Sequence, residues 1–307
     1  MNQKRQPLVS ILIPVYNGAP FLAETIASIK KNHYPNHEVI LVNDGSSDNS
    51  KLVCREFAKN SKKIRFYSFD QNQGMTRVLN FGIAKAKGKY IARLNQDDLI
   101  MPNRLEKQVK FLEQHPDYVA VGGQIKLFTE GNPKFGQVNF PLTDKKIRQN
   151  WLMFSPYSDP TVTYRKESVL RTEGYSQYFW PADDVHMWYQ LGKLGKLANL
   201  SGVMTKVRWH QSCGSIKSHK RQMLKTWQVH QWAAENVAKP SSGLRIFWAC
   251  QLLAGYLCPP QFNWAVYRLI KKIQFLSFDQ IKGKILGIIN KLKIVKPQPA
   301  MANLSGE

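Results

Sequence analysis

The sequence predicts an α/β fold in which helices cover a mostly parallel β-sheet. Through the first hundred residues, apolar β-branched runs alternate with helical segments, and the loops between them are short. This alternation is typical of parallel strands joined by crossover helices. The apolar runs are continuous rather than alternating, as expected for strands that are buried on both faces.

Each of the first strands is followed by a helix. The strands are expected at 8–15, 37–44, 63–69 and 89–95, and the helices at 23–32, 47–60 and 75–88. Beyond residue 118 the pattern loosens. Strands are expected there at 118–128, 159–170 and 196–210, with a helix at 181–195. In parallel sheets, ligands bind beyond the carboxyl ends of the strands. The ends of the first four strands are all polar, and we expect them to form one binding rim.

The composition is that of a globular but strongly basic protein. The 307 residues carry 44 basic and 21 acidic side chains, a net charge of +23, and 43% of the residues are hydrophobic. Such an excess favours a polyanionic partner: nucleic acid, an acidic membrane surface or a phosphorylated substrate. Solubility alone is the weaker explanation. The four cysteines show no zinc spacing and indicate the reduced thiols of a cytosolic protein.

The composition shifts in the last third, which divides the chain into a domain at 1–216 and a basic helical region at 217–307. This region holds 14 Lys and Arg but only 3 Asp and Glu. Its segment 280–294 places isoleucines and a leucine on one helical face and lysines elsewhere, which favours a membrane-surface helix. A helix packed on its own domain is the alternative. Because neither a signal-peptide pattern nor a run of about 20 apolar residues is found, we expect a cytoplasmic protein, peripheral on the inner face of the plasma membrane.

Two adjacent acids, Asp97 and Asp98, follow the fourth expected strand in the stretch "LNQDD". Carboxylates held at a strand end suit Mg²⁺ or Mn²⁺, ions that keep positions open for phosphate oxygens. Such an ion would stabilise a diphosphate as a leaving group. The alternative is structural, with Asp98 capping the next helix or pairing with Arg104.

A second acid pair, Asp183 and Asp184, opens the helix expected at 181–195. Helix capping is the simple explanation, because the helix dipole favours carboxylates there. If the pair faces the rim, one carboxylate could take a proton from an attacking hydroxyl. Arg208 and His210 lie two residues apart, so in a strand they face the same side and could bind phosphate or a metal. A core histidine and a surface arginine are the alternative.

The motifs taken together, "VSILIPVYNG…EVILVNDGSSDNS…NQGMTRVLNFGIAKAKGKYIARLNQDD", resemble those of family 2 glycosyltransferases. The resemblance runs from about residue 8 to 217, and the motifs stand in the family's order. It implies a Rossmann-like GT-A fold that binds a nucleotide sugar, and an inverting reaction.

The resemblance implies donor contacts at the ends of the first strands. The residues implied are Pro14, Tyr16, Asn17, Asp44, Gly74 and Arg77. Asp44 matches an acid that binds the base or ribose of the donor, and Arg77 would supply positive charge beside the nucleotide.

"LNQDD" corresponds to the family's D-x-D element, in which Asp97 would hold Mn²⁺ or Mg²⁺ with His210 as a further ligand. Asn95 replaces the other acid, so metal affinity is expected to be reduced or metal dependence altered. Its amide oxygen could ligate weakly or bind ribose. Arg208 and His210 would lie near the diphosphate.

On the acceptor side, Asp184 aligns with the family's base and Asp183 stands in for a Glu. Asp159 stands where a His often occurs. Together these residues would serve an inverting enzyme that moves a sugar from a nucleoside diphosphate sugar to a hydroxyl of a glycan or lipid-linked acceptor. Cell-surface polysaccharide or lipopolysaccharide synthesis is the expected process.

Two alternatives stay open at this point. One is sugar transfer to a lipid phosphate. The other is an inactive, membrane-bound homologue that only binds nucleotide sugars, an idea motivated by Asn95. An anionic membrane surface is the expected macromolecular partner. Since no nucleic-acid-binding motif is found, no specific nucleic-acid partner is expected.

Overall fold

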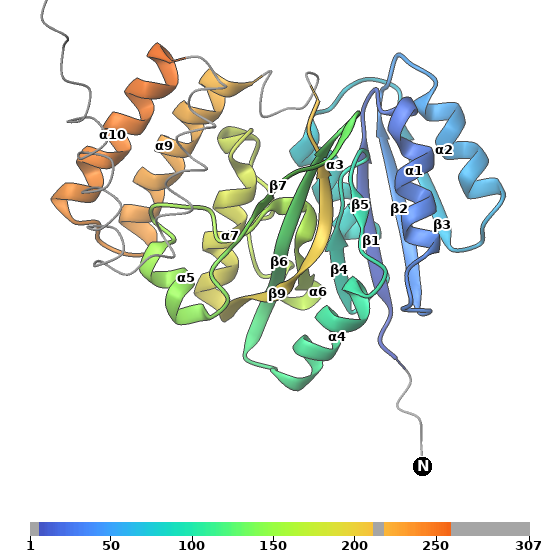
Figure 1. Ribbon diagram of the computed structural model, residues 1–307, viewed down its shortest axis with the longest axis horizontal. Helices are drawn as coiled ribbons and strands as arrows, with labels where there is room; N and C mark the ends of the chain where they lie inside the picture. The colour runs from blue at the N-terminus through green and yellow to red at the C-terminus, as the bar shows by residue number, and fades with distance from the viewer. Residues whose placement is uncertain (1–5, 211–217, 259–307) are drawn as a thin grey trace, which may run out of the picture. The chain divides into compact units, whose positions relative to one another are not determined.

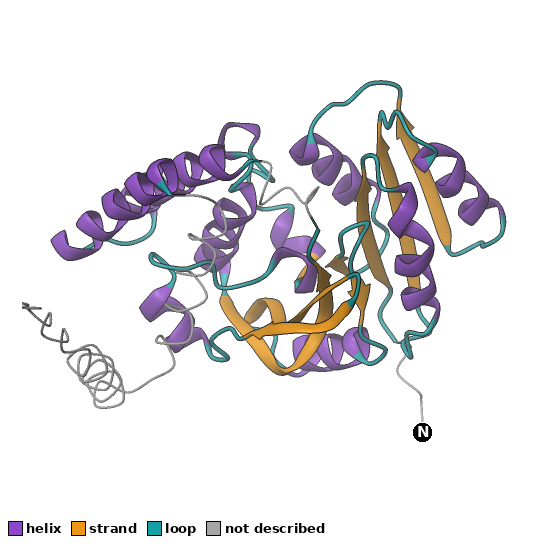
Figure 2. Cartoon of the chain, turned by 45° about the horizontal axis from the view of Figure 1, so that its top comes forward, coloured by secondary structure: helices purple, strands orange, loops and turns teal. Residues whose placement is uncertain are grey.

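The structure is a computed structural model that describes residues 6–210 and 218–258 of the chain. The described residues all fall in one compact unit, Met1–Pro260. A central β-sheet runs through it with helices on both faces (Figures 1 and 2). The α/β class predicted from the alternation of strands and helices is confirmed.

The sheet has nine strands. They are β1 (Val9–Val15), β2 (His37–Asp44), β3 (Ile64–Phe69), β4 (Tyr90–Arg93), β5 (Leu99–Ile100), β6 (Tyr118–Thr129), β7 (Asn132–Val138), β8 (Thr163–Arg165) and β9 (Lys196–Arg208). The order is β3-β2-β1-β4-β8-β6-β9-β5, with β7 paired to β6. The first four strands are parallel. Strand β8 enters antiparallel to both neighbours, so the second half of the sheet is mixed.

The helices follow the strands as crossovers in the first half. They are α1 (Ala19–Lys30), α2 (Ser50–Lys59), α3 (Met75–Lys85), α4 (Arg104–Gln114), α5 (Asp144–Asn150), α6 (Lys166–Val169), α7 (Asp183–Leu194), α9 (His219–Asn236) and α10 (Ser242–Leu257). The strand expected at 159–170 is wrong. A 3₁₀ turn (Asp159–Thr161), the three-residue β8 and α6 take its place, because Pro160 has no N–H for a ladder and Thr161 N donates back to Ser158 O.

Two hydrophobic cores lie on opposite faces of the sheet. Alternate strand residues point to opposite sides, so Leu12 packs with α3 and α7 while Ile11 and Ile13 pack with α1, α2 and α4. Burial on both faces explains why the strand sequences are continuously apolar. The carboxyl ends of β1, β2 and β4 stay at one edge of this double-sided core.

Helices α9 and α10 lie side by side, and α9 packs against α7 (Figures 1 and 2). Trp248 of α10 is buried, stacks on His230 with the ring centroids 4.9 Å apart, and donates from Nε1 to Leu152 O at 2.8 Å. The first part of the predicted basic region therefore contributes to the same core. Segment 280–294 lies outside the described residues, and the division of the chain at residue 216 stays a prediction.

In the described ranges, no helix combines the length and the apolar character that crossing a membrane requires.

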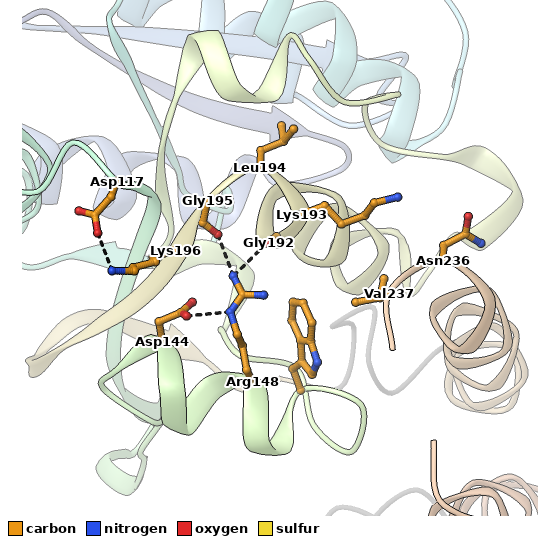
Figure 3. A pocket seen from close by; sticks show the side chains of 11 residues that line it. Asp117, Asp144, Arg148, Gly192, Lys193, Leu194, Gly195, Lys196, Asn236 and Val237 are labelled. Atoms are coloured by element: carbon orange, nitrogen blue, oxygen red, sulfur yellow. Dashed lines mark hydrogen bonds and ion pairs between the residues drawn. The ribbon is translucent and has the colours of Figure 1, made fainter. Parts of the chain in front are cut away.

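A surface cavity of about 800 Å³ lies at the carboxyl end of α7 (Figure 3). Inside it, Arg148 donates to Asp144 at 2.7 Å and, through one terminal nitrogen, to the carbonyls of Gly192 and Gly195 at 3.0 Å each. These carbonyls end α7 and have no partner within the helix, so a cation there is favourable. The cavity is thus lined by Arg148 and the two carbonyls that it binds, an arrangement that we call the helix-end clamp.

Replacing Arg148 by Ala is expected to lower the free energy of unfolding by about 1–2 kcal/mol, because two helix-end carbonyls lose a charged donor. Urea unfolding measures the change. Lys193→Ala is the matched control, since Lys193 lines the same cavity but is exposed. An equal loss of stability in both variants would contradict the clamp.

Candidate active site

The loop after β1 is fastened to the loops after β2 and β4. Tyr16 N donates to Gln96 Oε1 at 2.8 Å, and Gln96 Nε2 donates back to Tyr16 O at 3.0 Å. Asn17 has a φ of 49° and accepts from Ser47 N at 2.9 Å through its side-chain oxygen. Pro14 precedes this loop inside β1. The polar strand ends therefore do form one rim, and Gln96, which sequence reasoning did not single out, is its cross-link.

Asp44 closes the loop before α3. It is buried, and its two oxygens accept from Gln73 N at 2.6 Å and Gly74 N at 3.1 Å. Gly74 has a φ of 89°, a conformation that favours glycine, and Arg77 one turn later is exposed. Asp44 thus stabilises this loop. If Asp44 also contacts the donor, its carboxylate oxygens must do so while they accept these two hydrogen bonds.

Asp97 and His210 come together where the loop before β5 meets the end of β9, because β5 pairs antiparallel with β9. His210 Nε2 lies 2.9 Å from Asp97 Oδ2, and Arg208 Nε donates to Asp97 O at 3.1 Å. The Arg208 guanidinium lies over the rings of Phe128 and Phe21, 4.5 and 5.1 Å from their centroids. The structure thus brings Asp97, Arg208 and His210 together at one place.

The far end of the Arg208 side chain pairs with Glu24 of α1, a partner that the sequence did not suggest. The His210 ring packs against Phe21 with the centroids 4.8 Å apart. Both side chains are therefore held by α1 as well as by β9, which limits their freedom before any ligand binds.

Asp98 is buried behind Asp97 and does not cap a helix. Its Oδ1 accepts from Arg208 N at 2.9 Å and its Oδ2 accepts from Asn95 Nδ2 at 3.0 Å. Burial raises the pKa of Asp98 well above its usual range, and the charge of Asp97 adds to the effect. Arg104 is not its partner: it donates to main-chain carbonyls and neutral side chains.

The Asp97–His210 pair fits two neighbouring positions around a divalent ion. Ligand atoms about 2.1 Å from an ion and at right angles lie about 3.0 Å apart, close to the observed 2.9 Å. A carboxylate oxygen and an imidazole nitrogen are acceptable to Mn²⁺. Within residues 6–210 and 218–258, there is no group of three or more His, Cys, Asp or Glu side chains that could hold a metal ion. The remaining ligands would have to come from a bound substrate.

Asp183 and Asp184 occupy the first turn of α7, as predicted. Asp183 is buried, whereas Asp184 is partly exposed and accepts from Val185 N at 2.8 Å. Burial, followed by the charge of Asp159, raises the pKa of Asp184 to about 7. Burial, Asp184 and Asp159 raise the pKa of Asp183 well above its usual range. The pair thus offers one carboxyl that titrates near neutrality beside a second carboxyl whose pKa is also raised by burial.

A buried arginine, Arg93, lies between the two acid groups. It donates to Asn95 Oδ1 at 3.0 Å on one side and pairs with Asp159 on the other. Burial lowers the pKa of Arg93, but Asp159 together with Tyr175 and Tyr164 more than offsets this, so the pKa is raised and the group stays charged. The sequence signal was present: an arginine interrupts the apolar run of β4. Its partner in a distant turn was not readable.

Comparison with known proteins agrees with this architecture. Residues 10–174, which are 165 of the 307, match the model "Glycosyl transferase family 2". The "Amylovoran biosynthesis glycosyltransferase AmsE" of Erwinia amylovora is 30% identical over 218 residues, covering 70% of this chain and 79% of that protein.

Two solved structures share the fold. "Mannosyltransferase PcManGT from Pyrobaculum calidifontis in complex with GDP-Man and Mn2+" superposes with a TM-score of 0.60 at 18% identity, over 96% of this chain and 82% of that one. S. aureus TarS 1-349 in complex with UDP-GlcNAc gives 0.61 at 15%, over 87% and 78%. The GT-A type of fold is therefore confirmed. Because the family model matches more than half of the chain, this protein belongs to glycosyl transferase family 2 and is a glycosyltransferase.

Proposed function

We propose that the protein transfers a sugar from a nucleoside diphosphate sugar to a hydroxyl of a glycan or lipid-linked acceptor, with inversion at the anomeric carbon. The proposal rests on the presence of two groups of functional side chains, one on each side of the buried Arg93. On one side are Asp97, His210 and Arg208, and on the other is Asp184, whose pKa is raised to about 7. A general base works best when its pKa lies near the working pH.

The donor would bind along the rim. Tyr16 is 46% exposed and offers an aromatic ring on which a base can stack. Arg208 is charged, ordered by its contacts with α1, and close to the Asp97 main chain, which suits it to a diphosphate. Asp97 and His210 would hold Mn²⁺ or Mg²⁺, which neutralises the charge that develops on the leaving diphosphate. The bound GDP-Man and Mn2+ named for PcManGT support this assignment.

The acceptor would bind at the start of α7. Asp184 takes the proton of the acceptor hydroxyl, and the resulting oxygen attacks the anomeric carbon on the face opposite the diphosphate. Attack from that face inverts the configuration. Asp183 is buried beside Asp184, and burial together with the charge of Asp184 raises the pKa of Asp183 well above its usual range.

The proposal is tested by the configuration of the first product. The whole chain is incubated with UDP, GDP and dTDP sugars without an added acceptor, so that water takes the acceptor's place, and the anomer of the released sugar is followed by proton NMR before it mutarotates. An α-linked donor is expected to give the β product first. Release of the α product would contradict inversion, and Asp184→Asn serves as the inactive control.

We also propose that the protein is cytoplasmic and binds an anionic membrane surface at the inner face of the plasma membrane. Helix α10 supports this with apolar side chains that are between 47% and 74% exposed: Ile246, Leu253, Tyr256 and Leu257. Residues 246, 253 and 257 are 7 and 11 positions apart, so they share one face of the helix. Helix α9 carries Lys220, Arg221 and Lys225, which would meet acidic headgroups.

Replacing both Leu253 and Leu257 by Asp is expected to weaken binding to vesicles of 70% neutral and 30% anionic lipid by about tenfold or more at low salt, because buried apolar area is lost and negative charge is added. Co-sedimentation measures the change. The matched control is Leu52→Asp with Leu170→Asp, two leucines that are 58% and 60% exposed and lie on other elements. Equal binding by the two double variants would contradict the proposal that the apolar face of α10 binds the membrane.

A further inference from the structure

Asn95 uses both polar atoms of its side chain within the protein. Its Oδ1 accepts from Arg93 at 3.0 Å and its Nδ2 donates to Asp98 Oδ2 at 3.0 Å. The orientation of the amide follows from the partners, since an arginine can only donate and Asp98 already accepts from a main-chain N–H with its other oxygen. To ligate a metal or a ribose as well, Asn95 would have to use the second lone pair of Oδ1 or the second N–H of Nδ2 while keeping the orientation that these two bonds fix.

The two bonds continue in both directions. Beyond Asp98, Oδ1 accepts from Arg208 N at 2.9 Å, and Arg208 Nε donates to Asp97 O at 3.1 Å. Beyond Arg93 lies its ion pair with Asp159. A continuous series of polar contacts therefore runs from Asp97 and Arg208 on the donor side to Asp159. The charge of Asp159 raises the pKa of Asp184, the candidate base.

We infer that Asn95 is a positioning residue, which holds Asp98 and Arg93 together and so fixes Arg208 and Asp97 for the donor diphosphate. The inference rests on the proposed donor site. It differs from the expectation that Asn95 is a weakened metal ligand. In this chain, the side chain at position 95 stabilises the arrangement of neighbouring protein residues.

The chemistry explains why an amide suits the position. Asp98 needs a donor at Oδ2, and Arg93 needs an acceptor, and an amide supplies both in one planar group. An Asp at position 95 would have no N–H and would place two carboxyl groups about 3 Å apart, where both cannot be ionised at once. This side chain would keep the bond to Arg93 but lose the bond to Asp98 Oδ2, so Asp98, which accepts from Arg208 N through Oδ1, would be held from one side only.

This predicts a polarity exchange that can be measured. Asn95→Asp and Asp98→Asn are each expected to weaken the affinity for the nucleoside diphosphate that stabilises the wild type most, in the presence of Mn²⁺, by about tenfold, the effect of one charge-assisted bond. In the double variant, the bond between positions 95 and 98 is reversed: the Asn at 98 donates from Nδ2 and the Asp at 95 accepts. The Asn at 98 still accepts from Arg208 N through Oδ1. Affinity is expected to return to within about threefold of wild type.

Isothermal titration gives the affinities, and Mn²⁺ binding without nucleotide is followed by EPR. The inference is overturned if Asn95→Asp binds Mn²⁺ more tightly and the nucleotide equally well, because position 95 would then be a ligand position. It is also overturned if the double variant does not recover. Where a single variant fails to fold, recovery of thermal unfolding in the double variant gives the same answer. If the wild type binds no nucleoside diphosphate, the proposed function fails, and the exchange is still decided by thermal unfolding alone.

Discussion

Replacing Asp184 by Asn is expected to lower kcat for sugar transfer by about 10²–10⁴-fold, the range for loss of a general base. The amide keeps the shape of the carboxylate but cannot take the acceptor's proton. Nucleotide affinity is expected to change by less than about twofold, because the donor-side residues are untouched. Asp70→Asn is the control, since Asp70 is exposed and pairs only with the surface Lys51 in the described chain. Unchanged kcat in the Asp184 variant would remove Asp184 from the mechanism.

The pH dependence of the wild type follows from the same residue. With a pKa raised to about 7, Asp184 is mostly protonated below that pH, so kcat is expected to rise as the pH increases through about 7. Stability moves the other way. A pKa raised on folding stabilises the protein fully below the unfolded pKa of about 4, and this contribution is lost as the pH rises through about 7. Chemical unfolding between pH 4 and 8 should show a smaller decline for Asp184→Asn.

Replacing Asp97 by Ala is expected to weaken the binding of a nucleoside diphosphate with Mn²⁺ by about 10²-fold, or about 2.7 kcal/mol. The change removes the carboxylate 2.9 Å from His210 and leaves the Arg208 contact to the main chain in place. Isothermal titration with and without Mn²⁺ measures it, and the variant should lose most of the Mn²⁺ effect.

Asp117→Ala is the matched control, because Asp117 forms an exposed ion pair with Lys196 at the opposite end of β9. If the Asp97 and Asp117 variants bind the Mn²⁺–nucleotide complex equally, the Asp97–His210 pair is not the metal site. His210→Ala should give an intermediate loss, since it removes the second protein ligand and keeps the charged one.

The first half of the fold was predictable because its strands are buried on both faces. The expected strands at 8–15 and 37–44 agree with β1 and β2 to within one residue at either end. The expected helices begin and end within about four residues of α1, α2 and α3. The region from 159 to 170 failed because its apolar residues serve a turn, a short strand and a helix in succession, and the periodicity of so short a run cannot separate them.

The candidate site was predictable only as far as single motifs reach. Asp97 with His210, and the place of Asp184 at a helix start, followed from motif order and local spacing. The pairs that hold the site did not: Arg93 meets Asp159 across 66 positions, and Arg208 meets Glu24 across 184. Such contacts depend on strand order, which one sequence does not display. The sequence predicts a changed metal ligand at Asn95, but it does not display the two partners of this side chain, Arg93 and Asp98.

The central claim is that the rim bearing Asp97, His210 and Arg208 binds a nucleoside diphosphate. Thermal unfolding of the whole chain with UDP, GDP and dTDP, each with and without Mn²⁺, tests this most directly. One of the three is expected to raise Tm by about 5 °C at about 100 times its Kd, and to raise it less without Mn²⁺. If none of the three shifts Tm under either condition, the donor site and the mechanism built on it are contradicted.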